Sequence, residues 1–160
     1  MVTKAKYPKR NSNISHKKSF CFQSSSERET ESIGTRIAGW IKKYCIQCVI
    51  FIGPFGSGKT TLIRGIVKSL TGKNDVSSPS FTIVHEYKYG KSYIYHFDFY
   101  RIKHFFELES FGFREYTEKG LVLVEWPEVA IEKIPDRSMK VLIDFIGLKK
   151  RKIKIILPEK

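Results

Sequence analysis

The segment with the clearest chemical potential is residues 53–60, which read Gly-Pro-Phe-Gly-Ser-Gly-Lys-Thr. Two glycines separated by four residues and followed by lysine and a hydroxyl residue are typical of a phosphate-binding loop. Glycine lets backbone N–H groups converge on phosphate oxygens, Lys59 would neutralise the outer phosphates, and Thr60 would offer its hydroxyl to Mg²⁺. An apolar run at 49–52 precedes the loop, and a helical pattern at 61–67 follows it. This order predicts a binding site for a nucleoside triphosphate.

Two acidic residues each end an apolar run that predicts a strand. Asp98 follows residues 93–97. Glu125 follows residues 121–124. Because the carboxyl ends of strands line the ligand crevice of an open α/β sheet, we expect both carboxylates beside the loop. One would bind Mg²⁺ and the other would position or deprotonate the attacking water, and the sequence leaves that division open. Either acid alone could instead be a surface acid in a turn.

A third segment, residues 78–82, is a hydroxyl-rich connection ahead of a predicted strand. We expect it to form a loop that senses the γ-phosphate.

The elements that must position these residues alternate between helices and strands. Residues 27–42 have apolar positions at helical spacing and acids in the first turn, and residues 59–70 form a second helix after the loop. Short helical pieces are predicted at 103–117. Strands are predicted at 19–23, 47–52, 81–87, 92–97, 121–124, 139–146 and 152–157. We therefore expect an α/β three-layer sandwich like that of P-loop NTPases. It would have a mixed, mostly parallel sheet with antiparallel strands at the C-terminus.

The charge is concentrated at the two ends of the chain. The 160 residues carry a net charge of +13. Residues 1–26 hold six bases and no acid, and residues 147–160 hold six bases and one acid. We expect a basic, disordered tail at 1–18 and a single domain at 19–160. The basic ends would attract a polyanion such as tRNA weakly and without sequence specificity. The alternatives are a merely solvated surface or a transit peptide.

Composition and patterning also predict the cellular compartment of the protein. No apolar stretch approaches the 18 residues of a membrane helix, and no apolar segment follows the basic start as it would in a signal peptide. Three cysteines, an odd number, favour a reducing compartment over a disulfide scaffold. We expect a soluble cytoplasmic protein without membrane contact. Cys45 and Cys48 form a C-x-x-C pair, but without a second pair they are expected to fill the core rather than bind metal.

Four motifs follow one another along the chain, and together they make it resemble the TsaE (YjeE) family. The members of this family are small ATPases used in making threonylcarbamoyl-adenosine in tRNA. The motifs are residues 53–61, 78–81, 96–101 and 125–128. The resemblance extends from about residue 20 to residue 157. It implies a P-loop α/β domain that hydrolyses ATP with Mg²⁺. It also implies partners like TsaD and TsaB, which transfer the threonylcarbamoyl group to the adenosine beside the anticodon.

The loop motif and the resemblance together predict the site residues. Lys59, Asp98 and Glu125 would be catalytic. Thr60, Glu125 and Asp98 would hold the metal. The nucleotide would be bound by Gly53, Phe55, Gly56, Ser57, Gly58, Lys59, Thr60, Thr61, Thr30, Ser80 and Trp126. The chain departs from the family pattern at Ser80, where threonine is usual, and at residues 54–55, where an acidic and an aliphatic residue are common.

Two other functions remain open from the sequence. A small-molecule kinase would close an arginine-bearing lid over the phosphates; Arg101 and Arg114 are available, but no arginine-rich insertion occurs. Transfer of the γ-phosphate to an acceptor would identify that activity. A nucleotide-dependent binding module would need the same ligands as a slow ATPase, and a single-turnover measurement would separate the two. A GTPase is disfavoured because the chain has no Asn-Lys-x-Asp motif.

Overall fold

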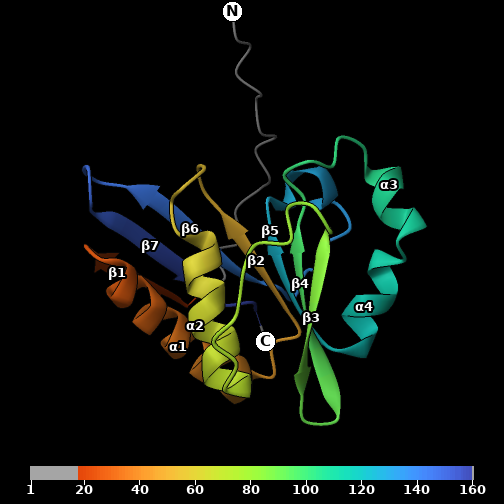
Figure 1. The fold of residues 1–160 in the computed structure, drawn as a ribbon, viewed down its shortest axis with the longest axis horizontal. Coiled ribbons are helices and arrows are strands. Elements are labelled where there is room, and N and C mark those ends of the chain that lie inside the picture. The colour runs from red at the N-terminus through yellow and green to blue at the C-terminus, as the bar shows by residue number, and fades with distance from the viewer. Residues whose placement is uncertain (1–17, 160) are drawn as a thin grey trace, which may run out of the picture.

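The computed structural model describes residues 18–159, so the predicted tail lies outside the described residues except for Lys18. A seven-stranded sheet runs through the molecule in the order β1-β7-β6-β2-β5-β4-β3 (Figure 1). Its strands are β1 (Ser19–Ser24), β2 (Cys48–Ile52), β3 (Val84–Tyr89), β4 (Ser92–Asp98), β5 (Leu121–Glu125), β6 (Met139–Phe145) and β7 (Arg151–Ile156).

The centre of the sheet is parallel and both edges are antiparallel. Strand β2 pairs in parallel with β6 and with β5, and β5 pairs in parallel with β4. The pairs β1–β7, β6–β7 and β3–β4 are antiparallel. The parallel pairs bring the carboxyl ends of β2, β4 and β5 to one edge of the sheet. The phosphate-binding loop, Asp98 and Glu125 therefore meet at that edge.

Helices cover both faces of this sheet (Figure 1). Helices α1 (Glu27–Tyr44) and α2 (Lys59–Thr71) pack on one face, over a core that includes Ile37, Leu62 and Val141. Helices α3 (Phe105–Ser110) and α4 (Phe113–Lys119) and the short 3₁₀ helix η1 (Pro127–Ala130) cover the other face, over Phe97 and Val124. The expected three-layer sandwich with a mixed sheet is confirmed. Within residues 18–159, no helix has the length and apolar character needed to cross a membrane.

The strands differ in how many faces they bury. Every residue of β5 is buried, as expected for a central parallel strand with helices on both sides. In β6 and β7, buried residues such as Val141 and Ile153 alternate with exposed or half-buried residues, because only the face toward α1 and α2 is covered. The opposite face of this part of the sheet carries Lys140, Lys152 and Lys154, all of them exposed.

Two glycines allow α1 and α2 to pack backbone against backbone. A Cβ on Gly34 would collide with the carbonyl oxygen of Leu62, and a Cβ on Gly65 would collide with the carbonyl oxygen of Glu31. Any other residue at these positions would push the helices apart. This close contact holds α2, and with it the end of the phosphate-binding loop, in a fixed position on the sheet.

Strand β3 differs from the sequence-based prediction, because it starts at Val84 rather than at residue 81. Residues 79–83 form a turn in which the N–H of Ile83 donates to the carbonyl oxygen of Pro79 at 2.7 Å. Ile83 has a φ of 68°, a conformation that β-branched residues rarely adopt. The carbonyl oxygen of Ile83 in turn accepts the N–H of Asp98 at 3.1 Å. This contact ties the turn to the end of β4.

The two cysteines of the C-x-x-C pair lie in different environments. Cys48 is buried in β2, as expected for a core-filling side chain. The same expectation is wrong for Cys45, which is exposed. Cys45 is the left-handed cap at the end of α1, where the chain turns away from the helix before it enters β2.

Candidate functional site

The phosphate-binding loop connects the end of β2 to the start of α2, and its glycines are required by the backbone. Gly56 and Gly58 have φ values of 71° and 105°. A Cβ on Gly53 would collide with the carbonyl oxygen of Ile143. Gly58 is the N-cap of α2 and provides no side-chain cap, so the first N–H groups of the helix are left for a ligand. A helix start of this kind attracts anions.

A cavity of about 370 Å³ opens beside this loop. Its walls come from the loop, from the turn before β3, and from the carboxyl ends of β4 and β5. The lining residues are Phe55, Gly56, Gly58, Lys59, Thr60, Thr61, Ser78, Ser80, Asp98, Tyr100, Glu125 and Trp126. Most of the residues predicted to bind nucleotide or metal therefore lie around one space, although they come from distant parts of the chain.

Lys59 is held at the base of the cavity. Its side chain is 4% exposed, and Nζ donates to the carbonyl oxygens of Gly53 at 2.8 Å and Pro54 at 3.0 Å. Nζ also lies 3.9 Å from the ring centroid of Trp126, in a cation–π contact. Burial lowers the pKa of Lys59, and the nearby carboxylates of Glu125, Asp98 and Glu128 oppose that shift. A phosphate group in the cavity would add to this stabilisation of the charged form.

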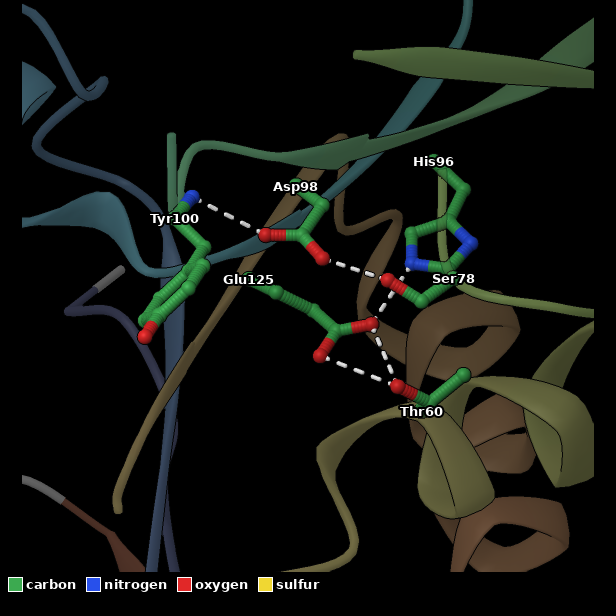
Figure 2. Close-up of polar contacts among 6 residues, drawn as sticks. All are labelled: Thr60, Ser78, His96, Asp98, Tyr100 and Glu125. Atoms are coloured by element: carbon green, nitrogen blue, oxygen red, sulfur yellow. Dashed lines mark hydrogen bonds and ion pairs between the residues drawn. The ribbon is translucent and has the colours of Figure 1, made fainter. Parts of the chain in front are cut away.

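The two predicted carboxylates lie side by side. Asp98 and Glu125 are opposite each other in the parallel β4–β5 pair, and both are buried. Thr60 Oγ1 donates to Glu125 Oε1 at 2.8 Å and to Oε2 at 3.1 Å (Figure 2). The Ser78 hydroxyl donates to Asp98 Oδ2, and the N–H of Tyr100 donates to Oδ1 at 3.0 Å. Glu125 is thus directed at the Thr60 hydroxyl of the loop, whereas Asp98 is held by Ser78 and by the backbone of Tyr100.

These groups fit a hard divalent cation such as Mg²⁺. A hydroxyl and two carboxylates are all oxygen ligands, which Mg²⁺ prefers. The described residues contain no group of three or more histidine, cysteine, aspartate or glutamate side chains that could hold a metal alone. Phosphate oxygens and water would have to complete an octahedral shell, as is usual for Mg²⁺ bound with a nucleotide.

Three predicted nucleotide ligands lie outside the cavity lining. Gly53 contributes its carbonyl oxygen to Lys59 instead. The Ser57 hydroxyl is buried and has no hydrogen-bond partner among the described residues. Thr30 is 1% exposed and donates to the carbonyl oxygen of Ser26 at 2.9 Å. A Cβ on Gly58 would lie 3.4 Å from the Thr30 methyl group, so Thr30 contacts the loop. A direct nucleotide contact for these three residues stays a prediction.

Ser78, in the segment 78–82 that was expected at the γ-phosphate, lines the cavity. The sequence prediction gave no role to three further residues that contact the site. Tyr100 lines the cavity, and His96 Nε2 lies 2.9 Å from Glu125 Oε1. The strand period offers a signal for His96, since it is two residues before Asp98 and therefore on the same strand face. Arg151 Nε donates to the carbonyl oxygen of Ser57 at 2.8 Å. Arg151 is far from the loop in sequence, and no local pattern indicates that contact.

Exposed aromatic side chains lie at the mouth of the cavity. Phe55 is 78% exposed and Tyr100 is 57% exposed. Their ring centroids are 6.1 Å apart, and the Tyr100 ring lies 5.1 Å from that of Trp126. Aromatic rings at the mouth of a cavity that also contains charged side chains can contact a nucleobase or the surface of a partner protein.

Known proteins are similar to this chain in sequence and in fold. Residues 24–153 match the model of the family described as threonylcarbamoyl adenosine biosynthesis protein TsaE. The chain is 39% identical to the tRNA threonylcarbamoyladenosine biosynthesis protein TsaE of Haemophilus influenzae over 94 residues. That match covers 58% of this chain and 60% of the Haemophilus protein, which is less than two thirds of its length.

Two further similarities extend over more of the chain. The TsaE protein of Rickettsia conorii is 33% identical over 136 residues, which are 84% of this chain and 77% of that protein. The crystal structure of Bacillus subtilis YdiB superimposes with a TM-score of 0.71 and 26% sequence identity. The superposition covers 91% of this chain and 89% of YdiB.

Proposed function

The chain belongs to the TsaE family, and from that premise we propose that it binds and hydrolyses ATP with Mg²⁺ in the threonylcarbamoylation of tRNA adenosine. The related proteins are named for the biosynthesis of this modified nucleoside. One observation carries the proposal of hydrolysis. Thr60 and the carboxylates of Glu125 and Asp98 line one cavity at the start of α2, where a triphosphate and its cation need them.

The residues of the loop bind and orient the triphosphate. The N–H groups at the start of α2 and the Lys59 ammonium neutralise the β- and γ-phosphates. Mg²⁺, when bound, withdraws charge from these phosphates. We assign its protein ligands to Thr60 and Glu125, because these two side chains are hydrogen-bonded directly to each other. Glu125 would then be a metal ligand and not the base.

Asp98 is left to position the attacking water. The Ser78 hydroxyl and the Tyr100 N–H fix the orientation of its carboxylate, which lines the cavity. Water attacks the γ-phosphorus, the bond from that phosphorus to the bridging oxygen breaks, and ADP leaves with the electron pair. Asp98 accepts a proton from the water as inorganic phosphate forms. The reaction needs no acceptor other than water, which separates it from the kinase alternative.

We propose that the partners are TsaD- and TsaB-like proteins, as membership of the family implies. The exposed rings of Phe55 and Tyr100 at the cavity mouth offer a surface that such a partner could cover. Hydrolysis by the isolated chain is then expected to be slow. A single-turnover measurement with and without the partners separates an ATPase from a nucleotide-dependent binding module. Bound ATP that stays intact in the full complex would support the binding module.

We also propose weak contact with tRNA through the basic C-terminal end, and we add Lys140 of β6, which lies outside that end. The open face of β6 and β7 carries the exposed Lys140, Lys152 and Lys154. Of these, Lys152 lies opposite Asp144 in the strand register, whereas Lys140 and Lys154 lie opposite Ile156 and Leu142. In the pairing of β6 with β7, no acid therefore lies directly opposite Lys140 or Lys154. Such a surface attracts a phosphate backbone without reading its sequence.

Binding of ATP and Mg²⁺ to the full chain tests the proposed function. Wild-type protein, mixed with its TsaD- and TsaB-like partners, is expected to bind Mg·ATP and release phosphate. Lys59→Met should abolish both, because Lys59 is the only lysine among the described residues that line the cavity. Lys73→Met is the matched control, since Lys73 is an exposed lysine just beyond the far end of α2. Equal ATP binding by wild type and Lys59→Met would contradict the proposal.

A further inference from the structure

Strand β4 contains a histidine that the proposed mechanism does not use. His96 is fully buried, at 0% exposure, and lies on the same face of β4 as Asp98. Its Nε2 is 2.9 Å from Glu125 Oε1, the same oxygen that accepts the Thr60 hydroxyl at 2.8 Å (Figure 2). One oxygen of Glu125 is therefore held between a residue of the neighbouring strand and a residue of the phosphate-binding loop.

The chemistry of this contact fixes the histidine ring. An ionised carboxylate only accepts hydrogen bonds, so with Glu125 ionised the contact requires the tautomer of His96 that carries its proton on Nε2. Nδ1 is buried and has no hydrogen-bond partner among the described residues. Among residues 18–159, Glu125 is thus the only hydrogen-bond partner of this buried ring. A buried ring nitrogen without a partner destabilises the fold, so the presence of a histidine here calls for a role in the site.

We infer that His96 is a positioning residue that holds Glu125 in the orientation needed to bind the divalent cation beside Thr60. The inference rests on the proposed function, because it assigns a role within the same site. Strands β4 and β5 are hydrogen-bonded neighbours, with His96 opposite Leu123 and Asp98 opposite Glu125. The pairing of the strands therefore fixes the backbone positions from which the ring and the Glu125 carboxylate meet. A carboxylate held in this way needs no reorientation when the cation arrives.

Two amide variants test this role with matched polarity. The amide nitrogen of glutamine reaches about as far as Nε2, whereas that of asparagine is one methylene shorter. His96→Asn is expected to raise the Mg²⁺ concentration for half-maximal ATP hydrolysis by about 10–100-fold in the complex with the partners. His96→Gln should recover most of the wild-type Mg²⁺ dependence. Binding of a fluorescent ATP analogue in EDTA should persist in both variants, because the loop and Lys59 are intact.

The outcomes separate this inference from the proposed function and from a purely structural role. A wild-type protein that neither binds nor hydrolyses Mg·ATP would refute both the function and the inference. An active wild type with the same Mg²⁺ dependence in His96→Asn would overturn the inference alone. Equal loss of metal-free nucleotide binding in both variants would also overturn it, because that pattern indicates a collapsed core.

A measurement on the unmodified chain covers the case in which a variant fails to fold. Long-range proton–nitrogen NMR should show His96 with a protonated Nε2 that exchanges slowly with water. That signal should shift when Glu125 is changed to glutamine, since the acceptor oxygen loses its charge. An unprotonated Nε2 in the folded wild type would overturn the inference.

Discussion

Each of the two carboxylates of the site has its own set of hydrogen-bond donors, and these sets suggest different tasks. Glu125 is bonded to Thr60 and to His96, and Asp98 is bonded to Ser78 and to Tyr100. The environments of the two acids are therefore unlike, although their backbones are adjacent. Groups with the same chemistry but different partners can take different roles in one reaction.

Asp98→Asn should lower ATP hydrolysis by about 10²–10⁴-fold, because the amide cannot accept the proton of the attacking water. Mg·ATP affinity should change much less, since Lys59, Thr60 and Glu125 are retained. Single-turnover phosphate release in the presence of the partners measures the effect. Asp144→Asn is the control, since Asp144 is an exposed acid on β6. Unchanged turnover in Asp98→Asn would exclude Asp98 as the base.

Cys48 should be inert toward thiol reagents in the folded protein. Burial raises its pKa from 9.0 to about 11, so the reactive thiolate is scarce at pH 8. A maleimide should label the exposed Cys21 and Cys45 at pH 8 and reach Cys48 only after denaturation. Because the folded state keeps the Cys48 proton that the unfolded state loses, stability should fall between pH 9 and about 11. Native labelling of all three thiols would contradict the structure.

The acids and the loop could be predicted from the sequence because each follows a recognisable apolar run. Asp98 and Glu125 are the last residues of β4 and β5, as the runs indicate. The contact between Arg151 and Ser57 could not be predicted, because it depends on β7 lying close to the phosphate-binding loop in space. Pairing between strands that no short turn connects has no local signature in the sequence.

At the scale of elements, the packing of α1 on α2 sets the position of the loop. Gly34→Ala places a methyl group against the carbonyl oxygen of Leu62 and should destabilise the protein by about 1–3 kcal/mol. Gly39→Ala, in the same helix, meets nothing within 4 Å. It should stabilise the protein by about 1 kcal/mol, because alanine favours the helix more than glycine. Denaturant unfolding of both variants measures the difference, and equal stabilities would contradict the close helix contact.

The start of β3 shows where element prediction fails. Residues 81–83 have strand-forming side chains, yet they belong to a turn that is closed by Pro79 and anchored to Asp98. Ile83 adopts a positive φ within this turn, against the intrinsic preference of its side chain. Contacts with β4 and with the site therefore override local propensity here. Unusual backbone conformations of this kind are concentrated near functional sites.

At the scale of the whole molecule, helices cover both faces of one half of the sheet. In the other half, which contains β6 and β7, one face is open and basic. The double variant Lys140→Gln/Lys154→Gln should weaken tRNA binding and reduce the slope of log affinity against log salt concentration by about one for each lysine. A filter-binding or fluorescence titration at several salt concentrations measures both quantities. The matched control is Lys42→Gln/Lys43→Gln, two exposed lysines at the end of α1. Equal affinity and slope in wild type and the sheet variant would remove the proposed tRNA contact.

The central parallel strands create the site by bringing three strand ends to one edge. The most direct test is to locate the divalent cation in crystals grown with a non-hydrolysable ATP analogue and Mn²⁺, using the anomalous scattering of the metal. We predict a peak within coordination distance of the Thr60 hydroxyl, next to Glu125 and in contact with the phosphates. A bound analogue whose metal lies away from Thr60, Glu125 and Asp98, or a cavity that takes up no nucleotide, would contradict this prediction.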